Sequence, residues 1–259
     1  VREHDIHGIL SDNRYGCFNS KINSVMLTHQ LHLQLPGQLV AWPANKVLQL
    51  ALAKFDSLWV PDVAEAPGLA GMLSHGASMH SDVRYTGILT RMQNYERESD
   101  YDVSVVLSGP EPQRTILEQH LLEQAIEMPH KFIFIQGQTK SKKHYYAAEN
   151  VEVVSYLTSS DLNDVLMASK LIVSRSGYSS VMDLAGLNKK AILIPTPGQT
   201  EQEYLAELLS QQQVFITQKQ NAINLDLGIR LLSKTTGLRP GVYANDLFKP
   251  VLRKWLEEL

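Results

Sequence analysis

Short apolar runs alternate with amphipathic stretches along the chain, most regularly in its second half. Apolar runs typical of buried strands occur at 103–107, 131–136, 151–155, 171–174, 191–194 and 214–216. Helical spacing of apolar residues occurs between several of these runs, at 113–126, 161–169, 179–187 and 201–212. Strands of nearly continuous apolar residues separated by helices are typical of a parallel sheet covered on both faces. The second half therefore predicts a doubly wound α/β domain.

The first half shows the same alternation with fewer elements. It predicts strands at 5–11, 23–28 and 57–61, a helix at 44–55, and a loop with one short helix at 62–82. So small a parallel sheet buries little core, and we expect a missing N-terminal portion to complete the first domain. A charged run without apolar residues, Arg97–Asp100, predicts the linker. We thus expect domains at 1–96 and 97–243, and a C-terminal helix within 244–259 that packs back onto the first domain.

Composition excludes several classes of protein. The 24 lysines and arginines against 27 aspartates and glutamates give a net charge of -3, which argues against a protein that coats nucleic acid. A single cysteine, Cys17, excludes an intramolecular disulfide and fits a reducing compartment. No apolar run reaches the roughly 18 residues of a membrane span, and the N-terminus lacks the apolar core of a signal peptide. We expect a cytoplasmic protein.

The turns after two of the strands carry polar residues where a doubly wound sheet binds ligands, beyond the carboxyl ends of its strands. The run 174–180 (SRSGYSS) opens a helix with a glycine and small hydroxyl residues. It predicts either a phosphate cradle at a helix N-terminus or a plain turn with serine caps. Further along that helix, Asp183 either binds a ribose diol or complements the helix dipole. The loop 195–204 (PTPGQTEQEY) offers either amides for sugar hydroxyls or a solvated helix start.

The order and spacing of these turns resemble the donor-binding domain of GT-B-fold glycosyltransferases, and most closely glycosyltransferase family 28. Family members carry a Ser-Gly-rich turn with an acidic residue six positions after its glycine, as Asp183 follows Gly177 here. Their loop ends Gln-Gln-Tyr, where this chain has 202–204 (QEY). The segment 86–91 (TGILTR) resembles the family's Gly-Asn-Pro-Val-Arg segment, and 27–30 (LTHQ) resembles its His-Glu-Gln-Asn segment. The similarity is most specific in the second half.

The resemblance implies a fold of two Rossmann-like doubly wound domains (GT-B). The N-terminal domain, incomplete in this chain, would face the acceptor, and the C-terminal domain would bind a nucleotide-sugar. The residues implied to bind substrate are Ser176, Gly177, Tyr178 and Ser179 for the diphosphate, Asp183 for the ribose, Leu157 for the base, Gln202 and Glu203 for the donor sugar, Arg91 for a phosphate, and Gly109 and Gln199 beside them.

The chain departs from the family pattern in three places. The run 108–112 (SGPEP) replaces a Gly-Gly-Ser-Gln-Gly loop. Its prolines remove two backbone donors, and Glu111 repels a diphosphate unless it points away. Asp183 replaces a glutamate, which shortens its reach, and Glu203 replaces a glutamine, which adds charge near the sugar. These differences leave the donor sugar open.

Sugar transfer with inversion needs a base for the acceptor hydroxyl and stabilisation of the leaving diphosphate. His29, at a strand end, is the expected catalytic base because an imidazole titrates near neutral pH; the alternative is a histidine held by backbone hydrogen bonds. The run 12–15 (DNRY) predicts either an acceptor contact or a polar turn. The pairs His29/His32 and His75/His80 lack the ligand spacing of a zinc site, so no metal is expected, and the resemblance implies no cofactor.

Three functions remain open at this stage. The first is an inverting hexosyltransferase that moves a hexosyl or N-acetylhexosaminyl group from a nucleotide-diphosphate sugar, expected to be UDP-linked, to a glycolipid or glycan acceptor in cell-envelope biosynthesis. The second is a nucleotide-sugar hydrolase or epimerase on the same fold, and the third is a non-catalytic binding module. The basic run Lys140–His144 is either a solvated loop or a contact with lipid phosphates, which would place the protein at the inner face of the membrane.

Overall fold

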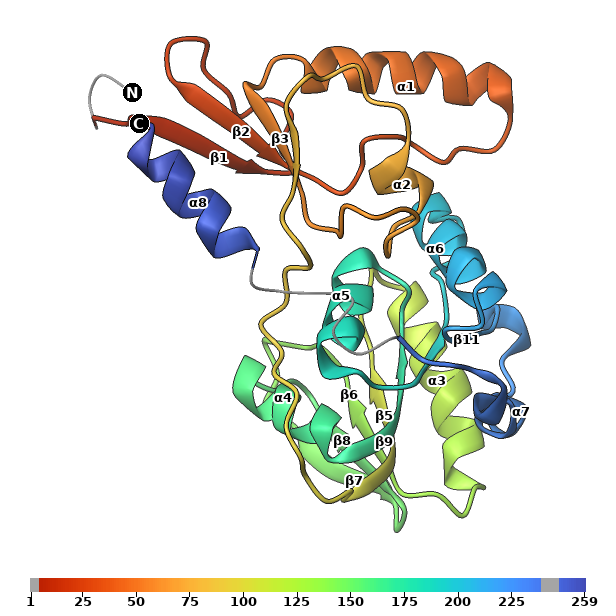
Figure 1. Ribbon diagram of the computed structural model, residues 1–259. Coiled ribbons are helices and arrows are strands. Elements are labelled where there is room, and N and C mark those ends of the chain that lie inside the picture. Colours follow the sequence, from red (N-terminus) through yellow and green to blue (C-terminus); the bar gives the residue numbers. More distant parts are fainter. Residues whose placement is uncertain (1–4, 239–246) are drawn as a thin grey trace. The chain divides into compact units, whose positions relative to one another are not determined.

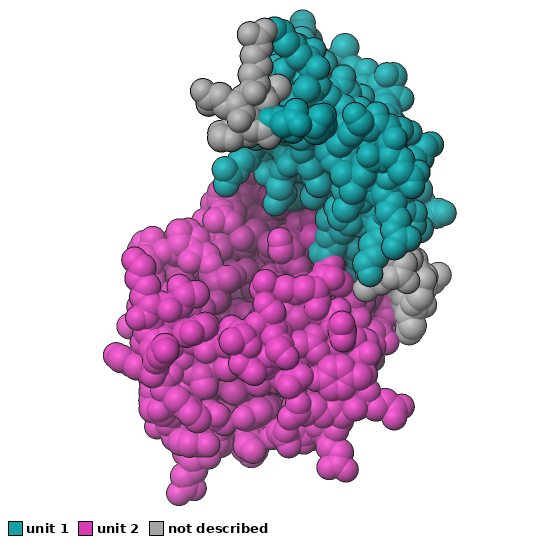
Figure 2. Space-filling view, turned by 90° about the vertical axis from the view of Figure 1, so that its left-hand side faces the viewer, with its two compact units in different colours: residues 1–89, 241–259 teal, residues 90–240 magenta. Residues whose placement is uncertain are grey.

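The computed structural model describes residues 5–238 and 247–259, which form two compact units. Unit 1 comprises residues 1–89 and 241–259, and unit 2 comprises residues 90–240 (Figure 2). The division falls at 89/90, a few residues before the 96/97 boundary expected from the charged run, and the expected 243/244 boundary lies outside the described residues. Within the described ranges, no helix is both long and apolar enough to cross a bilayer.

Unit 1 is built on a parallel sheet whose strands follow one another in sequence order, β1-β2-β3-β4 (Figure 1). The strands are β1 (Gly8–Asp12), β2 (Asn23–Leu27), β3 (Ser57–Val60) and β4 (Val83–Tyr85). The helices are α1 (Gln38–Leu52), α2 (Met72–His75) and α8 (Phe248–Glu257). The pattern predicted about three strands, and β4 is the additional one. It was missed because its three residues are all half-buried and form no apolar run.

The two faces of this sheet are covered by different helices. Side chains alternate along a strand, so neighbouring residues face opposite sides. On β2, Met26 packs with Leu48 and Leu52 of α1, whereas Val25 packs with Trp255 of α8. The C-terminal helix therefore completes the core of unit 1 (Figure 1).

Unit 2 contains a seven-stranded sheet in the order β11-β10-β9-β5-β6-β8-β7. All neighbouring strands are parallel except β7, which pairs antiparallel with β8. The strands are β5 (Tyr101–Val106), β6 (Phe132–Ile135), β7 (His144–Ala148), β8 (Val151–Val154), β9 (Ser169–Ser174), β10 (Ala191–Leu193) and β11 (Ile216–Thr217). The pattern predicted six of these strands but treated the region of β7 as a basic loop, because the side chains of this edge strand are mostly exposed and follow no apolar pattern.

Helices cover both faces of this sheet, as a doubly wound domain requires. They are α3 (Gln113–Ile126), α4 (Ser159–Met167), α5 (Tyr178–Leu187), α6 (Thr200–Gln211) and α7 (Leu225–Leu231), with short 3₁₀ turns η1 (Gln220–Ala222) and η2 (Leu232–Lys234). Phe132 and Phe134 of β6 pack with residues of α3, while Ile133 and Ile135 pack with residues of α4. The α3 bounds match the predicted helix, whereas α7 was not predicted.

Replacing Trp255 by alanine tests the contribution of α8 to unit 1. The indole is 6% exposed, lies edge-on to Trp59 at 5.8 Å between ring centroids, and donates from Nε1 to Asn23 Oδ1. Truncation leaves a cavity, so we expect a loss of about 3–5 kcal/mol in the free energy of unfolding of unit 1. Denaturant unfolding measures the loss, and Leu256→Ala on the exposed side of α8 is the matched control. Equal stability of the two variants would show that α8 does not complete this core.

Candidate functional site

In the sheet of unit 2, the order in which the chain adds strands reverses at β5. From β5 the chain continues to β6 on one side, and it returns through β9 on the other side. Ligands of doubly wound sheets bind in the crevice outside the carboxyl ends of the strands at such a switch point. The turns there are 107–112 after β5, 175–177 after β9 and 194–199 after β10. Together with α5 and α6, which follow the last two of these turns, they hold most of the residues expected to bind a nucleotide-sugar.

Arg175 is the largest polar side chain buried at this edge. It is 1% exposed, and its guanidinium donates to the Ile194 and Pro195 carbonyls through Nη1 and to the Gln113 carbonyl through Nη2. Burial lowers the pKa of Arg175 to about 10, so the group remains cationic at neutral pH. Sequence reasoning passed over this residue. The available signal was a charged residue directly after a buried strand, where an unpaired charge is costly.

Gln202 holds the two neighbouring turns together. Its Oε1 accepts from the Thr196 backbone N–H, its Nε2 donates to Gln199 Oε1 at 2.5 Å, and its carbonyl accepts from Ser176 Oγ. A methyl group added at Gly177 would lie 3.9 Å from Gln202 Nε2. The structure thus brings together Ser176, Gly177, Gln199 and Gln202. The Ser176 hydroxyl is fully buried and already donates to protein, so its role in the fold is structural.

The sequence predicted that Glu111 repels a diphosphate unless it points away. In the structure its carboxylate is turned toward the first turn of α3. Its carboxylate accepts from the backbone N–H and the hydroxyl of Thr115 and from the guanidinium of Arg114. These hydrogen bonds, that from the Thr115 hydroxyl first, lower the pKa of Glu111. The carboxylate therefore occupies the N-terminal end of α3, where the backbone N–H groups of a helix attract negative charge.

Asp183 lies in α5 and is half-buried. Its Oδ1 accepts from Thr90 Oγ1 at 2.5 Å. Burial is the largest influence and raises the pKa of Asp183, while the Thr90 hydrogen bond and the charge of Arg91 oppose that shift. Asp183 thus stands with Thr90 and Arg91 of the segment that resembles the family's Gly-Asn-Pro-Val-Arg motif.

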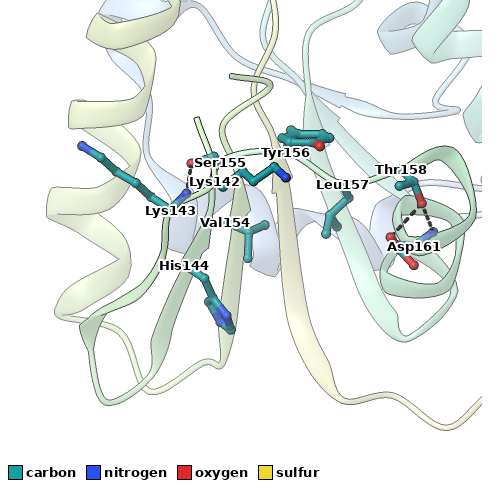
Figure 3. Close-up of a pocket in the computed structure, with 9 residues that line it drawn as sticks. All are labelled: Lys142, Lys143, His144, Val154, Ser155, Tyr156, Leu157, Thr158 and Asp161. Carbon is teal, nitrogen blue, oxygen red and sulfur yellow. Dashed lines mark hydrogen bonds between the residues drawn. The ribbon is translucent and has the colours of Figure 1, made fainter. Parts of the chain in front are cut away.

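Leu157 lies in the turn after β8 beside a cavity of about 320 Å³ (Figure 3). The cavity is lined by residues 142–144, 154–158 and 161, which include two lysines and the ring of Tyr156. Thr158 and Asp161 are hydrogen-bonded to each other at one side of it and cap α4. The cavity therefore combines apolar walls with positive charge near the turn expected to hold a base.

The remaining expected residues differ in accessibility. Arg91 and Ser179 are exposed, as is Gly109, whereas Tyr178 is buried. Glu203 is exposed and accepts from the Gly198 backbone N–H at 3.0 Å, so its carboxylate is held within its own loop. Few of the expected binding residues are therefore both exposed and without a hydrogen bond to their own loop.

In unit 1, the carboxyl edge of the sheet carries the half-buried His29 after β2. A second imidazole that sequence reasoning did not select lies in α2. Asp62, fully buried, accepts from the Ser74 hydroxyl at 2.7 Å, and Ser74 Oγ lies 2.8 Å from His75 Nδ1. Since the one hydroxyl proton of Ser74 goes to Asp62, His75 must carry its proton on Nδ1. In residues 5–238 and 247–259, no three His, Cys, Asp or Glu side chains are grouped to hold a metal ion.

Replacing Asp183 by asparagine tests the cost of its buried charge. The pKa of Asp183 is raised on folding, so the native state binds more protons than the unfolded state just above the unfolded value of about 4. Stability therefore falls as the pH rises through this window in the wild type, and Asp183→Asn, which keeps an oxygen for Thr90, escapes the fall. Denaturant unfolding should show that the free energy of unfolding of Asp183→Asn, relative to that of the wild type, increases from acid to neutral pH. Asp226→Asn on α7 is the surface control, and a variant less stable by a pH-independent amount would contradict the expectation.

Comparison with known proteins supports the family resemblance that the sequence motifs indicate. The model of the glycosyltransferase family 28 C-terminal domain matches residues 105–235, half of the chain. The UDP-N-acetylglucosamine--N-acetylmuramyl-(pentapeptide) pyrophosphoryl-undecaprenol N-acetylglucosamine transferase of Sulfurihydrogenibium sp. is 28% identical over 172 residues. That match covers 66% of this chain and 42% of the relative, so the matched part spans less than half the length of that relative.

Solved structures share the fold at low sequence identity. The glycotransferase of kitacinnamycin is 14% identical with a TM-score of 0.65, and the match covers 99% of this chain and 76% of that one. The spinosyn rhamnosyltransferase SpnG, in complex with thymidine diphosphate, is 12% identical with a TM-score of 0.62, and the match covers 99% and 74%. The expected GT-B fold is confirmed. The chain belongs to glycosyltransferase family 28, and its second unit contains the C-terminal domain of that family.

Proposed function

We propose that this chain binds a nucleotide-diphosphate sugar at the carboxyl edge of the unit 2 sheet and transfers its hexosyl or N-acetylhexosaminyl group to a glycolipid or glycan acceptor with inversion. The observation that carries the proposal is the cluster of Arg175, Gly177 and Gln202 at the switch point of a family 28 domain. The name of the Sulfurihydrogenibium relative describes N-acetylglucosamine transfer from UDP-N-acetylglucosamine to a pyrophosphoryl-undecaprenol acceptor, which favours a UDP donor and a lipid-linked acceptor here.

The donor would extend along this edge in three parts. Asp183 would accept hydrogen bonds from the ribose hydroxyls, exchanging its bond from Thr90 for those of the ligand. The base would enter the cavity beside Leu157, and the sugar would lie near Gln199 and Gln202. Because Gln202 Nε2 and Gln199 Oε1 bond each other, sugar hydroxyls would exchange for that bond and gain both a donor and an acceptor. The diphosphate would be neutralised by positive charge, with Arg91 as the exposed cation.

On the acceptor side, His29 is the proposed base, placed at the carboxyl end of β2. As a neutral imidazole, His29 would accept the proton of the attacking hydroxyl as a general base. No cofactor is proposed, and the nucleotide-sugar is a substrate.

A lipid-linked acceptor requires contact with a membrane surface, and α1 has the composition for it. Leu39, Trp42, Val47 and Leu50 on this helix are 62–94% exposed. The helix has no acidic residue, and Lys46 lies over the Trp42 ring. An exposed apolar surface with tryptophan and lysine is typical of helices that lie on anionic lipid. We propose that α1 contacts such a surface.

Asp183→Ala tests the donor site. Loss of the ribose hydrogen bonds should weaken binding of the nucleotide-sugar about tenfold, the effect of about 1.4 kcal/mol. Calorimetric titration measures the affinity, and thermal shifts with UDP-, GDP- and dTDP-sugars identify the base beforehand, since a ligand of the folded state raises the melting temperature. Asp226→Ala, on α7, is the matched control. Unchanged affinity in Asp183→Ala would remove Asp183 from the site.

Leu50→Glu tests the contact of α1 with lipid. A charge introduced into the apolar surface should reduce binding to phosphatidylglycerol vesicles severalfold, because a carboxylate is costly at the interface and is repelled by anionic headgroups. Co-sedimentation with vesicles measures the bound fraction. Leu227→Glu on α7 introduces the same charge at a partly exposed leucine of unit 2 and should bind as the wild type does. Equal binding of Leu50→Glu and Leu227→Glu would exclude α1 from the contact.

A further inference from the structure

Arg175 is a buried cation without a buried anion. Its guanidinium bonds only backbone carbonyls, and no carboxylate in the described ranges pairs with it. A buried charge is stable when it is paired, so an uncompensated one is costly. The carbonyls satisfy the two Nη atoms in part, whereas Nε is buried and has no hydrogen-bond partner among the described residues. The remaining donor therefore lacks both a bond and a counter-charge.

A second buried group without a partner faces the same space. The hydroxyl of Thr196, which is 2% exposed, makes no hydrogen bond within the part of the chain that the structure describes. A methyl group placed on Gly109 would lie 3.5 Å from Thr196 Oγ1 and 3.9 Å from Arg175 Nε. The glycine itself is exposed and has a φ of 98°. The missing side chain of Gly109 thus leaves a small space that borders both unpaired groups and adjoins the surface.

The turn that holds Gly109 leads into α3, whose N-terminal N–H groups could in principle attract an anion. That position is taken by the Glu111 carboxylate, which accepts from the Thr115 backbone N–H and from Arg114. An incoming phosphate would have to displace a carboxylate with two kinds of donor. At Gly109 a phosphate oxygen would break no hydrogen bond of the neighbouring donors, because Arg175 Nε and Thr196 Oγ1 have no partner among the described residues.

We propose that Arg175 Nε and Thr196 Oγ1 bind one anionic oxygen of a phosphate that lies against Gly109. The site rests on the proposed function, in which that phosphate belongs to the nucleoside diphosphate of the donor. A phosphate oxygen accepts from both groups at once and compensates the guanidinium charge. The glycine is needed because a larger side chain would fill the space that the oxygen enters. Thr196 is then a binding residue, and Arg175 both binds the phosphate and joins the turns.

The test compares ligand affinity with stability in the whole chain. Thr196→Val removes the hydroxyl and keeps the branched shape, and Thr196→Ser keeps the hydroxyl as the matched control. Calorimetric titration is carried out with UDP, uridine and inorganic phosphate. We expect Thr196→Val to weaken UDP binding about five- to tenfold, as for loss of a hydrogen bond to a charged group, and to leave uridine binding unchanged. The melting temperature of unliganded Thr196→Val should equal or exceed that of the wild type, because a buried hydroxyl without a partner is removed.

The outcomes separate this proposal from the proposed function. UDP binding that is equal in the wild type and Thr196→Val, or lost in parallel with uridine binding, overturns the phosphate site and leaves the donor function standing. Phosphate binding that Thr196→Val weakens, without any UDP binding, supports the phosphate site and contradicts the nucleotide donor. Binding of neither UDP nor phosphate by the wild type overturns both. A lowered melting temperature in Thr196→Val would show that the hydroxyl has a structural partner, which also contradicts the proposal.

Discussion

The hydrogen bonds of the buried guanidinium of Arg175 are the interaction on which the carboxyl edge of the unit 2 sheet depends. It donates to carbonyls at the start of α3 and at the end of the β10 strand, and so joins turns that are far apart in sequence. The planar fork of an arginine serves several acceptors at once, which a lysine ammonium does not do with fixed geometry. Burying the charge is costly, and its burial lowers the pKa to about 10. The turns are therefore held in place by a group that is itself short of a counter-charge.

The side-chain amide of Gln202 joins the turns at this edge. Gln202 bonds Thr196, Ser176 and Gln199, so it orders both turns before any ligand arrives. Groups that are already held in place lose little entropy when they bind. The same reasoning separates the two acidic residues of the site region. The carboxylate of Glu111 accepts hydrogen bonds from the first turn of α3. The carboxylate of Asp183 is half-buried, accepts from the Thr90 hydroxyl, and has a raised pKa because of its burial.

The pattern of apolar residues predicted the strands that are buried on both faces, such as 132–135 and 171–174, because burial dictates their composition. It failed where that constraint is absent. The edge strand β7 is exposed along most of its length, and β4 is short and half-buried. In the site region, the turns and the acidic residue of α5 were found from their place after strands and from the resemblance to family 28. Arg175 and Thr196 were not. The place of Arg175 directly after a buried strand was an available signal, but the lack of a partner for either side chain depends on residues that are distant along the chain.

The sequence by itself determined the class of each unit, the number of buried strands in the second half, and membership of family 28, since these follow from apolar periodicity and from turns with recognisable spacing. Only the tertiary structure decided that Glu111 turns onto α3, that α8 completes the core of unit 1, and that Arg175, Thr196 and Gly109 border one space. Each of these depends on groups that are distant along the chain or on the direction of a side chain. Local sequence carries no information on either, because both are set by packing of the whole unit.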